Sequence, residues 1–65
     1  MNKELLEYHM KKANKNIADM CSTLGISRSA YYRKCNGMSE FTLSEIQTIV
    51  AYLNLDSPME IFFAH

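Results

Sequence analysis

The sequence predicts an all-α domain, a compact bundle of five short helices. Glycine and proline are scarce, with two and one in 65 residues, which favours helices joined by short turns over a β fold. Thr42 and Glu45 form a capping box, in which each side chain satisfies a free amide of the other residue. A stripe of apolar residues follows at helical spacing: Ile46, Ile49, Val50 and Leu53. We therefore expect one domain over residues 1–65, with a core that is only marginal by itself.

The five expected helices cover about residues 2–12, 16–24, 27–36, 43–54 and 58–64. The first presents Leu6 and Met10 one turn apart, with Leu5 and Tyr8 nearby. Asn14 is the expected left-handed residue in the turn that follows. Further capping boxes are expected from Asn16 with Asp19 and from Ser57 with Glu60, where Pro58 suits the first helical position. In the last helix Ile61 and Phe62 can turn inward, which leaves Met59 or Phe63 toward solvent.

The second and third helices meet at a glycine. Gly25 can adopt positive φ without a Cβ clash, so the chain can reverse there within a short turn. Ser27 can cap the next helix at once, and Gly37 after Asn36 can end it in the left-handed conformation. Two helices joined in this way form a helix-turn-helix, whose second helix commonly enters the major groove of DNA.

The third helix has two different faces. Tyr31 and Cys35 are one turn apart and are expected to point into the core. Arg28, Ser29, Tyr32 and Arg33 fall on the other side, where groups that can reach guanine edges, phosphates and thymine methyls are gathered. These four are the predicted base-reading residues. Lys34 lies close to the inward arc, so we expect its stem to cover the core and its amine to reach water or a phosphate.

Three segments carry a resemblance to a known family: A-D-M-C before the turn, L-G-I-S-R-S across it, and Y-R-K-C-N-G at the end of the third helix. Together with the run SEFTLSEIQTIVAYLNLDSPMEIFF they resemble the Cro and phage-repressor family, also called the XRE or lambda-repressor-like helix-turn-helix family. The resemblance covers about residues 5–63. It implies that the third helix binds double-stranded operator DNA with sequence specificity. It also implies that the protein is a transcriptional regulator of a bacterium, phage or mobile element, with repression as the favoured role.

The sequence indicates the contacts to the DNA backbone less directly than the contacts to the bases. Many members of that family begin the second helix with a glutamine that contacts the backbone, but this chain has Ile17 there, and Asn16 is the candidate in its place. The full set of predicted backbone contacts is Lys12, Asn16, Ser27, Lys34, Asn36, Gly37 and Ser39.

Charge is distributed unevenly along the chain, although the net charge is zero. Seven basic and three acidic residues precede Gly37, which gives this part a charge of +4; four acids and no base follow from Met38, which gives −4. A dipolar domain of this kind can bind phosphates through its basic half, with modest non-specific affinity. Chance also produces such asymmetry, so it adds little weight.

Several classes of function lack a signal. Cys21 and Cys35 are separated by thirteen residues without a C-x-x-C pair, so we expect buried free thiols and no metal site. Neither a carboxylate pair nor a nucleophile beside a base appears, and we expect no enzyme, no cofactor and no small-molecule ligand. The absence of an apolar run long enough for a membrane span, and of a signal peptide, makes a cytoplasmic location the expectation.

One recognition helix contacts few base pairs, and related repressors pair two-fold so that two helices enter successive grooves. We therefore expect a weak homodimer that DNA favours, with Met59 and Phe63 at the contact. Two other classes stay open. One is a protein-interaction module that kept the fold and lost DNA binding, which the acidic second half slightly favours. The other is an antitoxin, which the lack of a further segment after His65 disfavours. A designed or truncated fragment of a larger repressor is also open.

Overall fold

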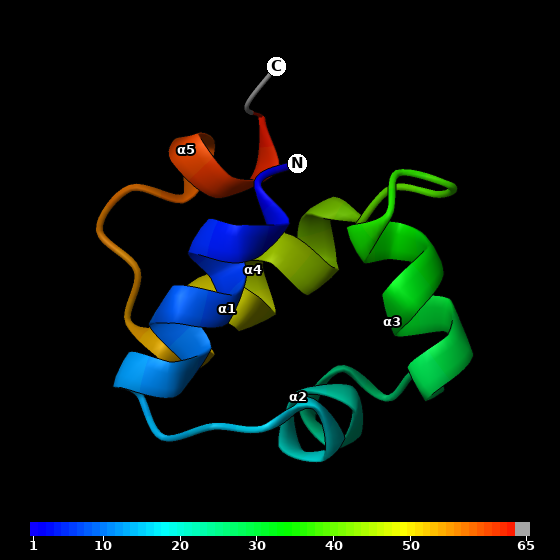
Figure 1. The fold of residues 1–65 in the computed structure, drawn as a ribbon, viewed down its shortest axis with the longest axis horizontal. Coiled ribbons are helices and arrows are strands. Elements are labelled where there is room, and N and C mark those ends of the chain that lie inside the picture. Colours follow the sequence, from blue (N-terminus) through cyan, green and yellow to red (C-terminus); the bar gives the residue numbers. More distant parts are fainter. Residues whose placement is uncertain (64–65) are drawn as a thin grey trace.

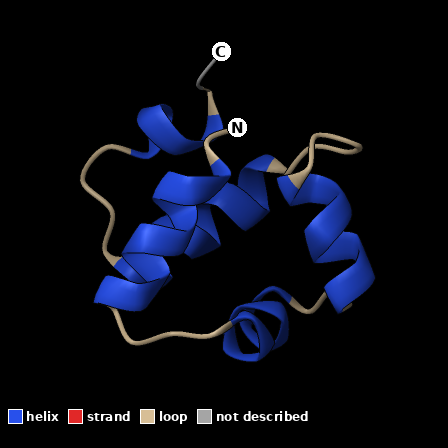
Figure 2. Ribbon diagram, viewed as in Figure 1, coloured by secondary structure: helices blue, strands red, loops and turns tan. Residues whose placement is uncertain are grey.

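The computed structural model describes residues 1–63 of the chain. It contains five helices, α1 (Lys3–Lys12), α2 (Ile17–Leu24), α3 (Arg28–Cys35), α4 (Leu43–Leu53) and α5 (Pro58–Phe62), and these residues form no strand (Figures 1 and 2). The predicted all-α fold of five helices is confirmed. The end expected for the last helix, near residue 64, lies outside the described residues, and α5 itself ends at Phe62. No helix in this part of the chain is long and apolar enough to cross a membrane.

Helix α3 lies at one side of the bundle (Figure 1). Helix α4 packs against α2 and α5, and α1 packs against α5, whereas α3 packs chiefly against α2 (Figure 1). The backbone amide of Asn2 donates to the carbonyl of Ile61 at 2.7 Å, so the start of α1 is tied to α5. Helix α3 therefore depends on α2, on the loop to α4 and on its own buried side chains for its position.

The core contains ten buried apolar residues drawn from all five helices and the α4–α5 connection: Leu6, Met10, Met20, Cys21, Tyr31, Cys35, Ile49, Leu53, Leu55 and Ile61. Most of the predicted inward faces are confirmed, and both thiols are free and buried. Tyr8, which was expected near the apolar stripe of α1, is instead 56% exposed. Leu55 was missed, because it lies after α4 where no helical spacing applies.

Polar side chains cap the starts of several helices, at positions that the sequence predicts. Asn16 and Asp19 form a complete capping box, as do Thr42 and Glu45, so both predictions are confirmed. Ser27 caps α3 by accepting from the amide of Ala30 at 3.1 Å. The predicted box at Ser57 is wrong, because its side chain makes no cap hydrogen bond and Pro58 alone starts α5.

Left-handed residues stand where the turns need them. Asn14, Gly25 and Gly37 have φ values of 58°, 70° and 79°, as predicted. Asn54, the C-cap of α4, is also left-handed, with a φ of 54°. At Gly25 the amide bonds back to the carbonyl of Cys21 at 2.8 Å, and the amide of Ile26 donates to the same carbonyl at 3.1 Å. The chain thus leaves α2 and reaches the cap of α3 in three residues.

Lys34 connects α3 to the start of α4. Its Nζ lies 3.0 Å from Oε1 of Glu45 and 3.1 Å from the carbonyl oxygen of Glu40, and it stands over the ring of Phe41. The prediction that this amine reaches water or a phosphate is therefore corrected. The Lys34 side chain is only 15% exposed, and its amine binds an acceptor eleven residues later in the sequence.

The same Glu45 oxygen accepts from the amide of Thr42 at 2.8 Å, so one carboxylate serves the cap and the ion pair. Partial burial disfavours the charged carboxylate, but the hydrogen bond from Thr42 and the Lys34 ammonium outweigh it. The pKa of Glu45 consequently lies below its ordinary value.

Replacing Gly25 tests the turn. A Cβ at Gly25 would meet no atom within 4 Å, so Gly25→Ala should cost only the strain of the left-handed backbone, about 1–2 kcal/mol of unfolding free energy. Gly25→Asn should cost less, because asparagine tolerates this region. Urea unfolding followed by circular dichroism measures both, with Ser22→Ala in the exposed part of α2 as the control. Equal stability of all three variants would contradict the role of the turn.

Glu45→Gln tests the ion pair through pH. Because the pKa of Glu45 is depressed in the folded state, its charge stabilises the fold fully above the ordinary glutamate pKa of about 4.3 and progressively less as pH falls through the lower folded value. At pH 7 the variant should therefore lose on the order of 1 kcal/mol, and near pH 3 its stability should approach that of the wild type. Thermal unfolding across this range measures the convergence. Glu60→Gln, at an exposed position, matches the change in net charge, and an identical pH dependence in both variants would refute the assignment.

Candidate nucleic-acid interface

The outer face of α3 carries the four predicted base-reading residues. Arg28, Ser29, Tyr32 and Arg33 are all exposed. The helix contains no acidic residue, and within residues 1–63 neither arginine forms an ion pair or a side-chain hydrogen bond. Two guanidinium groups are thus presented to solvent with all their donors available. Bidentate donors of this kind suit guanine edges and phosphates.

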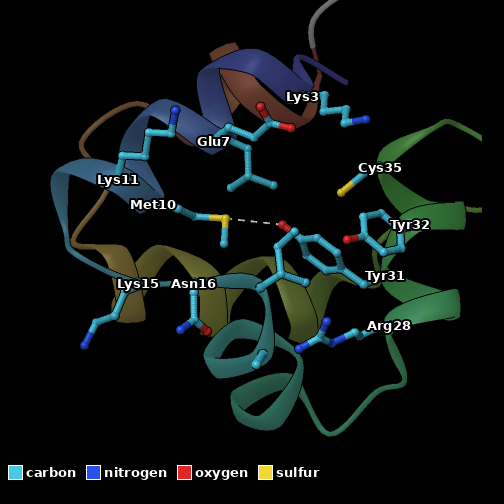
Figure 3. Close-up of a pocket in the computed structure, with 13 residues that line it drawn as sticks. Lys3, Glu7, Met10, Lys11, Lys15, Asn16, Arg28, Tyr31, Tyr32 and Cys35 are labelled. Atoms are coloured by element: carbon cyan, nitrogen blue, oxygen red, sulfur yellow. Dashed lines mark hydrogen bonds between the residues drawn. The ribbon is translucent and has the colours of Figure 1, made fainter.

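These four side chains do not all face the same way. Arg28 and Tyr32 extend toward the space between α3 and α1, where they border a hollow (Figure 3). Ser29 and Arg33 are not among the residues that line it. The Tyr32 ring also meets the edge of Tyr31, with 6.0 Å between the centroids, and remains 41% exposed. Arg33 and Ser29 therefore stand at the outer part of the face, and Arg28 and Tyr32 at its flank.

Tyr31 fixes α3 against the rest of the domain. Its side chain is 3% exposed, and its hydroxyl lies 3.3 Å from Sδ of Met10 on α1 (Figure 3). The ring also packs edge-on against Phe41 with 6.1 Å between centroids. Burial, aided by the neighbouring Cys35, raises the pKa of the Tyr31 hydroxyl well above its ordinary value, and burial raises the pKa of the Cys35 thiol. Both groups are therefore neutral near pH 7. The inward face of α3, opposite the exposed arginines, is thus packed through uncharged side chains.

The end of α3 holds several predicted backbone contacts. Asn36, Gly37 and Ser39 are exposed. The amide of Gly37 donates to the carbonyl of Lys34, however, and those of Met38 and Ser39 donate to Arg33. These amides are thus engaged within the chain, which leaves the side chains of Asn36 and Ser39 as the available groups. Lys34 is engaged as well, by Glu45.

The starts of the helices hold two further predicted contacts, both exposed. The Asn16 side chain accepts from the amide of Asp19 at 2.8 Å, and the Ser27 hydroxyl caps α3. Each side chain therefore already satisfies a helix start. The Asn16 amide group and the Ser27 proton remain as donors.

Lys12 lies away from the rest of the predicted interface. It borders a hollow that contains Asp56 and Glu60, on the other side of α1 from the residues that face α3. Lys12 therefore shares a hollow with two acidic residues of the α4–α5 region. This geometry does not place Lys12 on the same surface as the exposed face of α3.

The hollow between α1 and α3 was missed by the sequence interpretation. It has a volume of about 590 Å³ and takes residues from three helices, so no local pattern reveals it. Its charged side chains are Lys3, Glu7, Lys11, Lys15 and Arg28. The uneven charge along the chain was the one available signal, and the structure gathers part of the basic half around this opening.

The two residues predicted for a pairing surface, Met59 and Phe63, are exposed. Met59 and Phe63 are 65% and 52% exposed, whereas Ile61 is buried and Phe62 half-buried. The amide of Phe63 donates to the carbonyl of Met59 at 3.1 Å, which places the two residues one turn apart.

No curated protein and no solved structure is similar to the chain. A family model described as the BetR domain matches residues 2–65, almost the whole chain. The described part of the match is the five-helix fold with the exposed, acid-free α3. The chain therefore belongs to the BetR domain family.

Proposed function

We propose that this BetR domain is a transcriptional regulator that binds operator DNA with sequence preference and acts as a repressor. The observation that carries the proposal is the pair of unengaged arginines on the exposed face of α3, a helix that follows a glycine turn and contains no acid. A connection of this length with a glycine is typical of helix-turn-helix proteins, in which the second helix lies in the major groove. The resemblance to the Cro and phage-repressor family supports the same interpretation.

Roles within the interface follow from position. Arg33 and Ser29, at the outer part of the α3 face, are the proposed base readers, with Arg28 and Tyr32 contacting bases or adjacent phosphates at its flank. The Asn16, Ser27, Asn36 and Ser39 side chains supply donors to the DNA backbone. We omit Lys12 and Lys34 from the proposed interface, because acidic residues neighbour the first and Glu45 holds the second.

Arg33→Ala tests the reading face. Selection of bound sites from random duplex DNA should yield a motif for the wild type, and the variant should lose preference at one base pair at a cost of about 1–3 kcal/mol. Lys12→Ala removes one positive charge from the other side of α1 and should leave the motif unchanged. If Arg33→Ala lowered affinity for every sequence equally, Arg33 would contact a phosphate. A flat response of the wild type to DNA at low salt would favour a protein-interaction module instead.

Pairing on DNA is the second part of the proposal. Two recognition helices separated by about 34 Å would read successive major grooves, and a pairing surface must hold them there. The exposed Met59 and Phe63 form the candidate surface. Burying one such aromatic pair per dimer would supply on the order of 2–4 kcal/mol, which allows weak association that DNA completes.

Phe63→Ser tests this surface. Sedimentation at rising concentration should show a monomer–dimer equilibrium for the wild type and a weaker one for the variant, which should also bind a two-half-site operator less tightly. Tyr8→Ser removes an exposed aromatic of α1 as the matched control. Unchanged self-association and unchanged operator affinity in Phe63→Ser would exclude α5 from the interface.

A further inference from the structure

The hollow between α1 and α3, termed the α1–α3 groove, is a partly open pocket. It is bordered by α1, the α1–α2 loop, the start of α2 and the inner side of α3 (Figure 3). Its volume is about 590 Å³. Sites for small molecules in proteins have volumes of roughly 300–1,000 Å³. The groove thus has the capacity for an organic molecule of ordinary metabolite size.

The floor of the groove is apolar. Leu6, Met10, Tyr31 and Cys35 form it, and each of these residues belongs to the buried core. Ile17 adds a half-buried side wall at the start of α2. A floor of carbon and sulfur offers water few partners, so an apolar body that displaced this water would gain free energy.

The rim is cationic. Lys3, Lys11 and Arg28 border the opening, and within residues 1–63 none of them forms an ion pair. Lys15 borders it as well, with its amine 4.8 Å above the ring centre of Tyr52. Glu7 is the one carboxylate on the rim. The three unpaired cations, Lys3, Lys11 and Arg28, outnumber this carboxylate and produce a potential that attracts anions and repels cations.

A hydroxyl lies at the floor with only weak partners. The Tyr31 hydroxyl points into the space between α1 and α3, where its neighbours are two sulfur atoms, the Met10 thioether at 3.3 Å and the Cys35 thiol (Figure 3). A thioether sulfur is a weak acceptor, whereas a carboxylate oxygen forms a short, charge-assisted bond. The Tyr32 hydroxyl is directed into the same space (Figure 3). Two phenolic donors would thus be available to an anionic ligand that enters from the rim.

We propose that the α1–α3 groove binds an organic anion with an apolar body, of the class of aryl- or alkyl-carboxylates. The body lies against Ile17 and over the apolar floor, and the carboxylate meets the Tyr31 hydroxyl and the rim cations. A DNA phosphate would match the rim but has no apolar part to cover the floor. This binding does not depend on the proposed DNA function, and it is measured on the protein alone.

The test uses 4-phenylbutyrate as the probe, with its neutral amide and 4-phenylbutylamine as matched compounds. Titration into the labelled chain, followed by amide NMR at constant salt up to about 10 mM, should show saturable shifts confined to α1, the start of α2 and α3. The amide should bind at least about tenfold more weakly, because it lacks the charge, and the amine should not bind. No saturable shift with the carboxylate, or equal binding of all three compounds, would overturn the proposal.

Variants separate the groove from other sites. Lys11→Gln should weaken binding severalfold, whereas Lys12→Gln, next in sequence but on the other side of α1, should not. Tyr31→Phe keeps the ring and removes the donor, so it should weaken binding by roughly tenfold. Ala18→Phe places a large side chain at the exposed rim and should block the groove. The amide spectrum of each variant without ligand reports its fold. Equal losses in Lys11→Gln and Lys12→Gln, or shifts centred on Phe63, would assign the binding to general charge or to the α5 surface and refute the groove.

Discussion

The burial of the Tyr31 ring between α3 and α1 is the contact on which the outward face of α3 depends. Helix α3 packs chiefly against α2, and little backbone of α1 approaches it. The Tyr31 side chain reaches from α3 to α1, where its hydroxyl contacts Met10, and its ring packs edge-on against Phe41. Since a helix of eight residues has little stability of its own, the side chains that bury one face decide where the other face points. The position of Arg28 and Arg33 therefore follows from an apolar contact on the opposite side of the helix.

A second constraint fixes the end of α3. Lys34 and Glu45 join the last turn of α3 to the first turn of α4, and the same carboxylate caps α4. Geometry favours this pair, since its oxygen also accepts a backbone hydrogen bond and the amine also donates to the carbonyl of Glu40. A half-buried pair with these additional bonds restricts the α3–α4 loop more than an exposed pair would. The exposed Asn36 and Ser39 at this end are thereby held in place relative to the face they flank.

How far the sequence predicts this structure depends on the range of each interaction. Caps and turns are local, so Asn16, Gly25, Ser27 and Thr42 were placed correctly from residues within four positions of each other. The inward face of α3 followed from helical periodicity for the same reason. Contacts between distant segments could not be placed: Lys34 meets a carboxylate eleven residues away, and the α1–α3 groove requires three helices to be positioned first. Ser57 shows the opposite failure, because a local pattern matched a capping box and the backbone before Pro58 did not adopt it.

The two proposed sites share residues, and this sharing has an energetic consequence. Arg28 and Tyr32 flank the proposed DNA face and also border the groove. A guanidinium that pairs with a carboxylate in the groove has fewer donors for a phosphate or a base, so each ligand would bind more weakly in the presence of the other. Such a coupling is reciprocal, and its size is bounded by what Arg28 and Tyr32 contribute to either complex. Arg33 and Ser29 lie outside the groove, so base reading by them would persist while the flank is occupied. A carboxylate in the groove would then weaken the contacts made by Arg28 and Tyr32 and leave the base preference read by Arg33 and Ser29 unchanged.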